Sequence, residues 1–215
     1  MKLKLFLFLL PVIFFQIGCA STNLNPITNG KLQLETDETG IWHQVEEEQK
    51  ALNRSGVLYA DKELEEYLNE TDRKLYSESV LAQIPFSIHV IKNRQFNAFA
   101  YPNGHVYVHT GILACMENEA QLATLLAHEM THVTHRHTVK GFRNLKNKTA
   151  LLATLQVTLG GLGGGVGDLA SLLGTFGTLA AVSGYSRELE TEADMEGFKL
   201  IKEAGELAGK NWTET

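Results

Sequence analysis

Apolar residues return at helical spacing over two stretches in the first half of the chain. Over residues 41–53, and again over about 61–81, apolar side chains recur every three or four positions. Asp61 stands directly before the second periodic run, where a short acidic side chain can cap the first turn of a helix. The pattern predicts two helices whose many carboxylates form a solvated face.

Three short segments rich in β-branched and aromatic residues follow, at residues 85–92, 95–102 and 105–112. Asn93 breaks the run after the first segment, and the turn sequence at residues 102–104 separates the last two. We therefore predict three short strands, the last two joined by a tight turn.

Two further helices are expected in the second half of the chain. From about Glu117 to His137, apolar residues line up near one side of a helix. From about Tyr185 to Ala204 a last helix is expected, which closes at Gly205 because glycine favours the left-handed position after a helix.

The segment at residues 150–184 is apolar but interrupted by many glycines. Glycine is about 1 kcal/mol worse than alanine in a helix interior. Small residues spaced four apart permit close helix contact, which inside a bilayer would suggest a dimerising span, but Gln156 and Asp168 count against one. We expect a packed or partly mobile hairpin of the soluble domain, with a membrane-inserted hairpin as the alternative.

The N-terminus has the layout of a secretory signal. Lys2 and Lys4 precede an apolar run over residues 5–15, and small residues stand ahead of Cys19. The run is short for a membrane span, which needs about 20 residues.

Cys19 and the residues before it resemble the lipobox of bacterial lipoproteins, in which the cysteine is lipidated and becomes the new N-terminus. Gln16 departs from that pattern, and ordinary signal-peptidase cleavage that leaves a free thiol is the alternative. Ala20 resembles the residue found in lipoproteins sent to the outer membrane. With Cys19 lipidated, Cys115 has no partner in the chain, so we expect it to be a small buried core residue.

The composition limits the classes of function. At 215 residues the chain has the length of one ordinary domain with appendages. A content of 44% hydrophobic and 20% charged residues is typical of a packed globular protein. The formal net charge of -6 argues against a nucleic-acid partner, which would need a concentrated basic face.

The stretch LLAHEMTHVTH carries the most specific chemistry. His128 and His132 are four positions apart in an expected helix, so they project from one face, and Glu129 completes the H-E-x-x-H pattern of zinc sites. Catalytic zinc takes three protein ligands and leaves a fourth position for water. His135 cannot be the third ligand, because seven residues of helix place it about 10.5 Å along the axis from His128.

The third ligand is therefore expected from another element. The last helix offers Glu190 and Asp194, four residues apart, so that one can bind the ion while the other supports a ligand. Glu188 and Glu192 compete with them on sequence grounds.

Three ordered motifs carry a family resemblance: NAFAYPNGHVYVHTGIL, LATLLAHEMTHVTHRH and YSRELETEAD. They resemble the gluzincin metallopeptidase family of the CAAX prenyl endopeptidase and the HtpX protease, over about residues 61–204. The lipobox makes the chain most similar to the periplasmic lipoprotein branch. The resemblance implies an α+β fold, a mainly helical zincin-like metallopeptidase domain with a small three-stranded sheet and an active-site helix that carries the H-E-x-x-H motif.

The resemblance also implies a site. In that family the two motif histidines and the glutamate four before the aspartate of E-x-x-A-D bind one zinc ion, which implies His128, His132 and Glu190 here. The family's roles imply that Glu129 is the general base and that Asp194 orients a zinc-bound histidine. Zinc would lower the pKa of its water toward about 7, so that Glu129 can take a proton and the water can attack a peptide carbonyl.

Family enzymes hold an extended substrate against a strand near the metal, which implies substrate contacts at Asn97, Ala98, Phe99 and Ala100. The expected function is that of a zinc-dependent endopeptidase of the bacterial envelope, which cleaves unfolded or misassembled proteins. It would face the periplasm from an N-terminal lipid anchor in the outer membrane. The alternative is a lipid-anchored chaperone or outer-membrane assembly factor with a structural or rarely used metal site.

The expected organisation is a signal peptide at residues 1–18, a lipid anchor and tether at 19–35, and the zinc metallopeptidase domain at 36–215. Family members commonly continue past the last helix with further helices, which include a histidine or arginine implicated at the site. Neither is visible here, so we expect a fragment or an altered C-terminus that weakens turnover.

Overall fold

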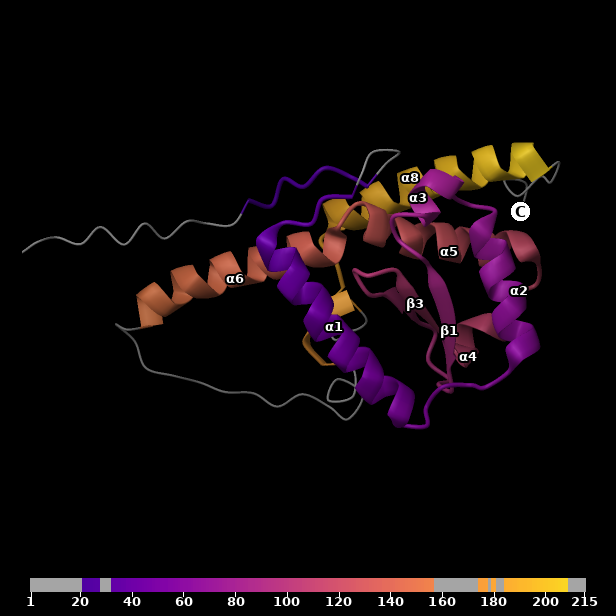
Figure 1. Cartoon of the computed structure of the whole chain (residues 1–215), viewed down its shortest axis with the longest axis horizontal. Helices are drawn as coiled ribbons and strands as arrows, with labels where there is room; N and C mark the ends of the chain where they lie inside the picture. The colour runs from indigo at the N-terminus through magenta and orange to yellow at the C-terminus, as the bar shows by residue number, and fades with distance from the viewer. Residues whose placement is uncertain (1–20, 28–31, 157–173, 178, 181–183, 209–215) are drawn as a thin grey trace, which may run out of the picture.

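The computed structural model describes residues 21–27, 32–156, 174–177, 179–180 and 184–208. Within these ranges the chain is mostly helical, with one three-stranded sheet among the helices (Figure 1). The elements in chain order are α1 (Thr36–Arg54), α2 (Lys62–Arg73), α3 (Glu78–Leu81), β1 (Ser87–Ile91), β2 (Ala98–Ala100), β3 (His105–His109), α4 (Thr110–Leu113), α5 (Glu119–Thr134), α6 (His137–Gln156) and α8 (Arg187–Ala208). This is the α+β class expected from the sequence.

The sheet has the strand order β1-β3-β2, and the central strand β3 pairs in parallel with β1 and antiparallel with β2. The three predicted strands are confirmed, as is the tight turn between the last two. There the Gly104 N–H donates to the Tyr101 carbonyl at 3.1 Å, and Gly104 has a φ of 95°, a left-handed value that glycine adopts without strain. β2 is an edge strand, so one row of its backbone groups faces away from the sheet.

Both faces of the sheet are buried, because side chains alternate along each strand. Val90 and Val108 point into a core that they share with α2 and α5. Phe99 and Tyr107 point the other way, into a second core closed by Val45 of α1. The sheet is therefore a middle layer between α1 and α5 (Figure 1).

The helix predictions hold in type but not at every boundary. Asp61 caps α2 as predicted, since its side chain accepts a hydrogen bond from the Leu64 N–H at 3.1 Å. The prediction that this helix continues to Leu81 was wrong. α2 ends before Leu75, which lies in a turn but is still buried. Its position fits the helical spacing of apolar residues, so this spacing did not reveal the end of the helix. Gly205 does not close the last helix either, because it is buried within α8.

The predicted helix over residues 117–137 is interrupted by a sharp turn near its end. His135 caps α5 by donating its N–H to the Thr131 carbonyl at 2.9 Å, and α6 begins at His137. Arg136 between them has a φ of 56°, which few residues other than glycine adopt. The turn changes the chain's direction, so His137 can contact α5 from a different helix.

Residues 21–27, the described part of the expected tether, pack against the domain. Leu24 and Ile27 are buried, and the Ile27 N–H donates to a backbone carbonyl at the end of α5 at 2.7 Å. The Arg143 guanidinium donates to the Ser21 carbonyl at 2.7 Å and is paired with two carboxylates at the start of α1. The chain is thus held to the folded surface from Ser21 onward in this segment.

No helix in the described part of the chain is long and apolar enough to cross a membrane. The expected signal at residues 1–18 and the lipidated Cys19 lie outside the described residues, as does most of the glycine-rich stretch at 150–184.

Asp72, at the end of α2, should make stability fall as pH rises. It is 1% exposed, its Oδ1 atom has no hydrogen-bond partner, and burial raises its pKa to about 7. Because the folded-state pKa lies above the unfolded one, the folded state holds a proton that the unfolded state has lost between about pH 4 and 7. The contribution to the free energy of unfolding is complete below about pH 4 and is lost as pH rises through 7.

We expect Asp72→Asn to flatten this pH dependence, because asparagine has no proton to gain. At pH 8 the variant should exceed the parent in free energy of unfolding by a few kcal/mol, with about 4 kcal/mol as the upper limit. Urea unfolding of both proteins at pH 5 and pH 8 measures the difference. Equal pH dependence in the two proteins would contradict a raised pKa of the buried Asp72 carboxyl.

Candidate metal centre

Two helices that pack along one another, α5 and α8, carry the predicted metal ligands (Figure 1). Asn118 caps α5 by accepting a hydrogen bond from the Gln121 N–H at 3.0 Å. The packed side of α5 is apolar, so the helix presents His128 into a cavity beside α8. A Cβ atom at Gly197 of α8 would lie 3.2 Å from the His128 backbone nitrogen, and this glycine lets the two backbones approach closely.

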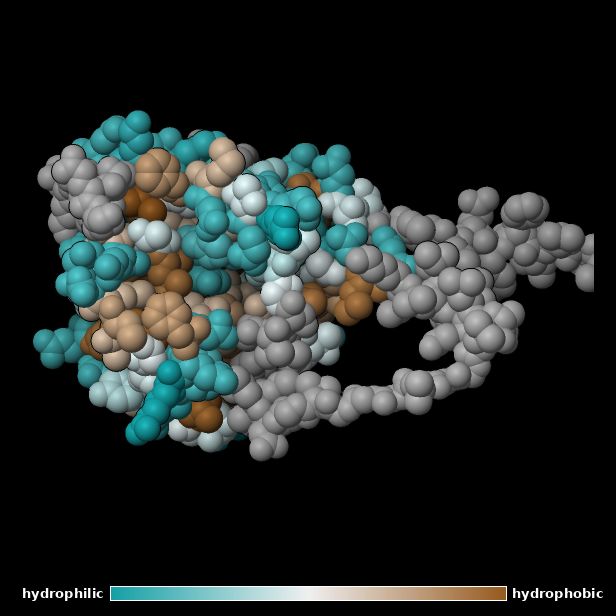
Figure 2. Space-filling model, turned by 180° about the vertical axis from the view of Figure 1, so that it is seen from behind, coloured by the Kyte–Doolittle hydropathy of each residue, from teal (hydrophilic) through white to brown (hydrophobic). Residues whose placement is uncertain are grey.

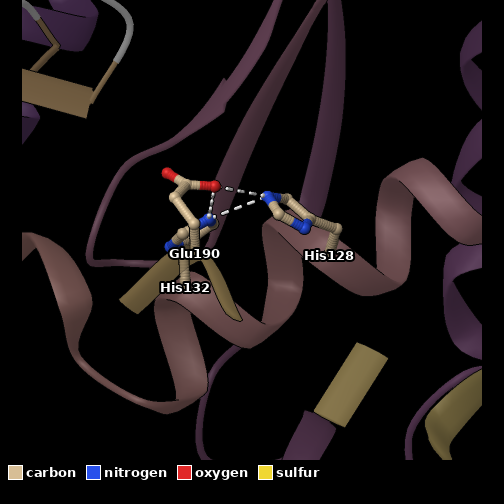
Figure 3. A group of neighbouring side chains, drawn as sticks. All are labelled: His128, His132 and Glu190. Atoms are coloured by element: carbon tan, nitrogen blue, oxygen red, sulfur yellow. Dashed lines mark hydrogen bonds and ion pairs between the residues drawn. The ribbon is translucent and has the colours of Figure 1, made fainter. Parts of the chain in front are cut away.

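His128, His132 and Glu190 converge on one point (Figure 3). The Nε2 atoms of the two histidines are 3.0 Å apart, and the Glu190 Oε2 atom lies 3.4 Å from that of His128 and 3.8 Å from that of His132. A tetrahedral zinc ion with bonds of about 2.0–2.1 Å holds its ligand atoms about 3.4 Å apart. The three side chains therefore fit a zinc ion, with both imidazoles binding through Nε2.

Two contacts hold these side chains in their orientations. The Nδ1 atom of His128 lies 2.9 Å from Asp194 Oδ1, so an N–H at Nδ1 can donate to the carboxylate and leave Nε2 free for the metal. The Tyr185 N–H donates to Glu190 Oε1 at 3.4 Å, which leaves Oε2 facing the histidines. The Tyr185 ring also stacks on the His132 ring, with 4.0 Å between centroids.

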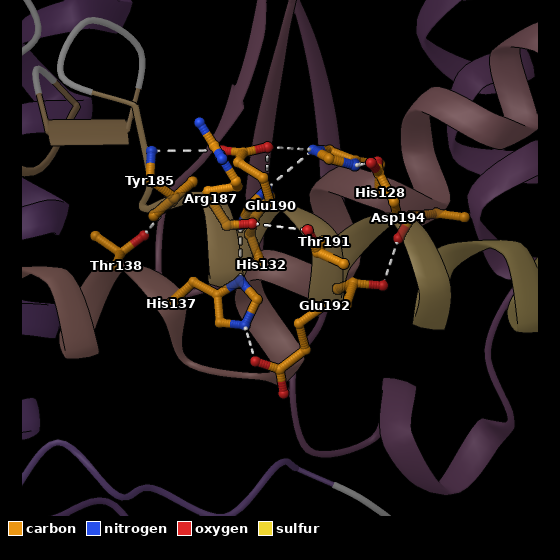
Figure 4. Close-up of polar contacts among 12 residues, drawn as sticks. His128, His132, His137, Thr138, Tyr185, Arg187, Glu190, Thr191, Glu192 and Asp194 are labelled. Carbon is orange, nitrogen blue, oxygen red and sulfur yellow. Dashed lines mark hydrogen bonds and ion pairs between the residues drawn. The ribbon is translucent and has the colours of Figure 1, made fainter.

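His132 is held on its other side by a second imidazole. Its Nδ1 atom lies 2.8 Å from Nδ1 of His137, and the Nε2 atom of His137 lies 3.1 Å from Glu192 Oε2 (Figure 4). His137 is wholly buried, and burial lowers its pKa to about 4. The structure thus places Glu192 beside His137, away from the three converging ligand atoms.

Glu129 is almost completely buried next to the three converging side chains of His128, His132 and Glu190. Burial, and to a smaller extent the negative charge of Glu190, raise the pKa of its carboxyl to about 8. Glu129 and both cluster histidines line the same cavity. A carboxylate in this position can exchange a proton with a molecule bound in the cavity.

The cavity has a volume of about 1050 Å³ and extends from the cluster along an apolar wall. Phe96, Met116, Leu125 and Phe198 are among the apolar residues that line it. Seen from behind, apolar residues gather over the half of the molecule where α5 and α8 lie (Figure 2). The cavity can therefore receive an extended chain with apolar side chains.

The predicted substrate strand reaches this cavity with only some of its side chains. Asn97 and Ala98 line the cavity. Phe99 and Ala100 are each 1% exposed and point into the two cores on either side of the sheet. The strand pattern alternates, so a run of four neighbours cannot present every side chain to one cavity.

Of the remaining predicted residues, His135 and Glu188 lie apart from the cluster, whereas Asp194 contacts it. His135 is the C-cap residue of α5, and its ring contacts Thr134 Oγ1 at 3.2 Å. It is therefore not one of the three converging side chains, as expected from the rise of the helix. Glu188 is exposed on the first turn of α8. Asp194 contacts His128 directly.

Cys115 corrects one expectation. It is an exposed free thiol that lines the cavity, whereas we expected a small buried core residue. The apolar residues around it belong to the four-residue helix α4 and the turn that follows, at the edge of the cavity, so an apolar neighbourhood in sequence did not mean burial.

Sequence reasoning missed His137 and Tyr185, and it considered Glu192 only as a rival ligand. A fourth histidine in the same stretch, five residues after His132, was a visible signal. Its position depends on the left-handed turn at Arg136, which no local pattern predicts.

Comparisons with known proteins agree with this geometry. Residues 62–212 match peptidase family M48. The chain is 30% identical over 159 residues to the beta-barrel assembly-enhancing protease of Escherichia coli (strain K12), which covers 73% of this chain and 33% of that protein. It is 32% identical over 140 residues to the mitochondrial metalloendopeptidase OMA1 of Schizosaccharomyces pombe, covering 64% of this chain and 39% of the relative.

A putative beta-barrel assembly-enhancing protease of Vibrio cholerae is 28% identical over 161 residues, covering 73% of this chain and 33% of the relative. The chain therefore spans about a third of the length of these bacterial relatives.

Proposed function

Because this chain belongs to peptidase family M48, we propose that it is a zinc-dependent endopeptidase that cleaves unfolded or misassembled proteins of the bacterial envelope. The observation that carries the proposal is the convergence of His128 Nε2, His132 Nε2 and Glu190 Oε2 at zinc-like spacing, beside the buried Glu129. Relatives named as metalloendopeptidases support the same class of reaction.

His128, His132 and Glu190 are the proposed ligands of the metal, for which zinc is the ion that this donor set favours. When bound, zinc supplies Lewis acidity that polarises a peptide carbonyl and lowers the pKa of a water molecule. The proposed role of Glu129 is to take a proton from that water on its carboxylate and deliver it to the departing amide nitrogen. Asp194 holds the N–H of His128 and so keeps its Nε2 turned toward the ion.

The substrate is proposed to lie in an extended form along the free edge of β2. Asn97 accepts from the His109 N–H at 3.0 Å and Tyr101 donates to the His105 carbonyl at 2.8 Å, so these alternate residues turn their backbone toward β3. By the same alternation Ala98 turns its N–H and C=O outward.

Ala100 follows the same rule, so two outward-facing residues offer backbone groups for pairing with a peptide. Phe99 then supports the strand from its core and does not touch substrate. Recognition through backbone groups gives weak selectivity for side chains, which suits unfolded proteins as substrates.

The proposed address is the bacterial envelope, with the domain facing the periplasm from an outer-membrane lipid anchor at Cys19. The signal-like layout of residues 1–18 supports it. The names of the bacterial relatives, which refer to β-barrel assembly, support misassembled envelope proteins as the substrate class. Because the family is one of peptidases, the comparisons do not favour the alternative of a lipid-anchored chaperone with a rarely used metal site.

Metal removal tests the proposal. The chain, carrying its full sequence, should cleave β-casein when loaded with one equivalent of zinc, and a chelator should abolish the cleavage because the Lewis acid is lost. Adding zinc back should restore it, whereas magnesium should not, since magnesium prefers oxygen ligands. Stoichiometric zinc together with casein binding and no cleavage would overturn the peptidase proposal in favour of the chaperone.

A further inference from the structure

His137 is a wholly buried imidazole that contacts the back of a proposed metal ligand. Its Nδ1 atom lies 2.8 Å from Nδ1 of His132, and its Nε2 atom lies 3.1 Å from Glu192 Oε2. The two rings are nearly perpendicular, with an interplanar angle of 74°, so this is an edge contact between nitrogen atoms and not a stack. Both ring nitrogens of His137 therefore have polar partners (Figure 4).

The positions of the protons on the His132 and His137 rings follow from what lies at each end of this chain of contacts, a metal at His132 and a carboxylate at Glu192. If His132 binds a metal through Nε2, a neutral imidazole must carry its proton on Nδ1. That N–H then donates to Nδ1 of His137, which must be an acceptor. A neutral His137 consequently carries its proton on Nε2, where it donates to the Glu192 carboxylate. One assignment satisfies all three groups.

We propose that Glu192 and His137 form a relay of positioning residues that fixes the ring orientation and tautomer of His132 for metal binding. The inference rests on the proposed ligand role of His132. The Asp194 carboxylate contacts His128 directly at 2.9 Å. The Glu192 carboxylate instead contacts the ring of His137, which in turn contacts His132. A buried imidazole satisfied at both nitrogens avoids the cost of leaving a polar atom unpaired.

The fold explains why a relay is needed at His132. The ring of His132 is 2% exposed, and the contact at its inner nitrogen, Nδ1, comes from His137 at the start of α6. The left-handed residue Arg136 starts a new helix at His137 and turns that ring under His132. α8 then supplies Glu190 to the metal cluster and Glu192 to the relay.

A plainer role for Glu192 is a salt bridge. Its Oε2 atom lies 3.8 Å from Lys140 Nζ, and its side chain is 37% exposed. A partly exposed ion pair of this kind contributes about 0–1 kcal/mol to stability and nothing to metal affinity. The two roles therefore differ in what they predict for zinc binding.

The test measures zinc affinity by chelator competition in the full chain. Removing the relay carboxylate with Glu192→Ala should weaken zinc binding about 10-fold, within the range of 10- to 100-fold seen when a hydrogen-bond partner of a metal ligand is lost. Glu192→Gln keeps an oxygen that can accept the His137 N–H, so it should recover part of the affinity. Glu188→Ala, the same change at an exposed site on the same helix, should alter zinc affinity less than about twofold.

Nitrogen NMR of histidine supplies a readout that a salt bridge would not move. In the zinc-loaded parent, His132 should carry its proton on Nδ1 and His137 on Nε2, with both N–H signals protected from exchange. In Glu192→Ala the His137 signal should lose its protection. A proton on Nδ1 of His137 in the parent would overturn the relay, because His132 could then not accept at Nδ1 and bind metal at Nε2 in a neutral state.

Failure of the relay and failure of the proposed function are distinguishable. A parent chain that binds no zinc overturns the ligand assignment itself. A parent that binds zinc tightly, beside a Glu192→Ala variant with unchanged affinity and unchanged histidine tautomers, overturns only the relay.

Discussion

Glu129→Gln should reduce casein cleavage by about 10²- to 10⁴-fold while zinc remains bound, the range that a lost general acid and base costs. Glutamine has nearly the same shape and volume as glutamate, but it cannot take a proton from water. The carboxyl is buried, and Glu129 lines the cavity together with His128 and His132. Cleavage of β-casein and zinc content by atomic emission, measured on the same preparation, check the expectation.

Glu117→Gln is the matched control, because Glu117 is an exposed glutamate just before α5 that is not among the residues lining the cavity. It should cleave casein at the parental rate. Retained cleavage in Glu129→Gln would disprove the general-base role. Loss of zinc from the same variant would instead mean that the carboxylate is needed for metal binding.

Glu190→Gln should weaken zinc binding by more than about 100-fold, beyond the effect of losing an outer hydrogen-bond partner. The amide is neutral and binds zinc poorly, and only two imidazoles would remain in the cluster. The cleavage of casein should be lost with the metal. Because a ligand that binds the folded state stabilises it, zinc at about 100 times its dissociation constant should add about 2.7 kcal/mol to the parent.

That stabilisation is the second readout. At the same zinc concentration Glu190→Gln should gain almost none of it, while Glu188→Gln on the exposed turn of α8 should gain as much as the parent. If Glu190→Gln bound zinc as tightly as the parent, the third ligand would have to be another group, and the convergence of Oε2 with the two Nε2 atoms would be incidental.

The part of the site that local geometry determines could be predicted from the sequence. His128 and His132 share a helix face because they are four residues apart, and helix rise alone removed His135. The third predicted ligand depends on tertiary structure, because it comes from a different helix. Spacing left four acidic residues of the last helix open, the family resemblance selected Glu190, and the packing of α8 on α5 brings its carboxylate to the histidines.

Two features of the site could not be predicted from the sequence. The position of His137 depends on one backbone angle, and the exposure of the β2 side chains depends on which face of the sheet meets which core. Arg136 in a left-handed conformation turns His137 under His132, and no motif marks that turn. The alternation of the strands was visible, but the sequence did not show which face met which core, and so did not show that the side chains of Phe99 and Ala100 are buried.

The packing of residues 21–27 has a consequence for how the domain would work at a membrane. Only Ala20 separates Cys19 from Ser21, whose carbonyl is bound by Arg143. With Cys19 acylated, about 7 Å of chain would join lipid and folded surface. So short a tether would hold the domain against the bilayer and leave it almost no freedom to move away from the membrane surface.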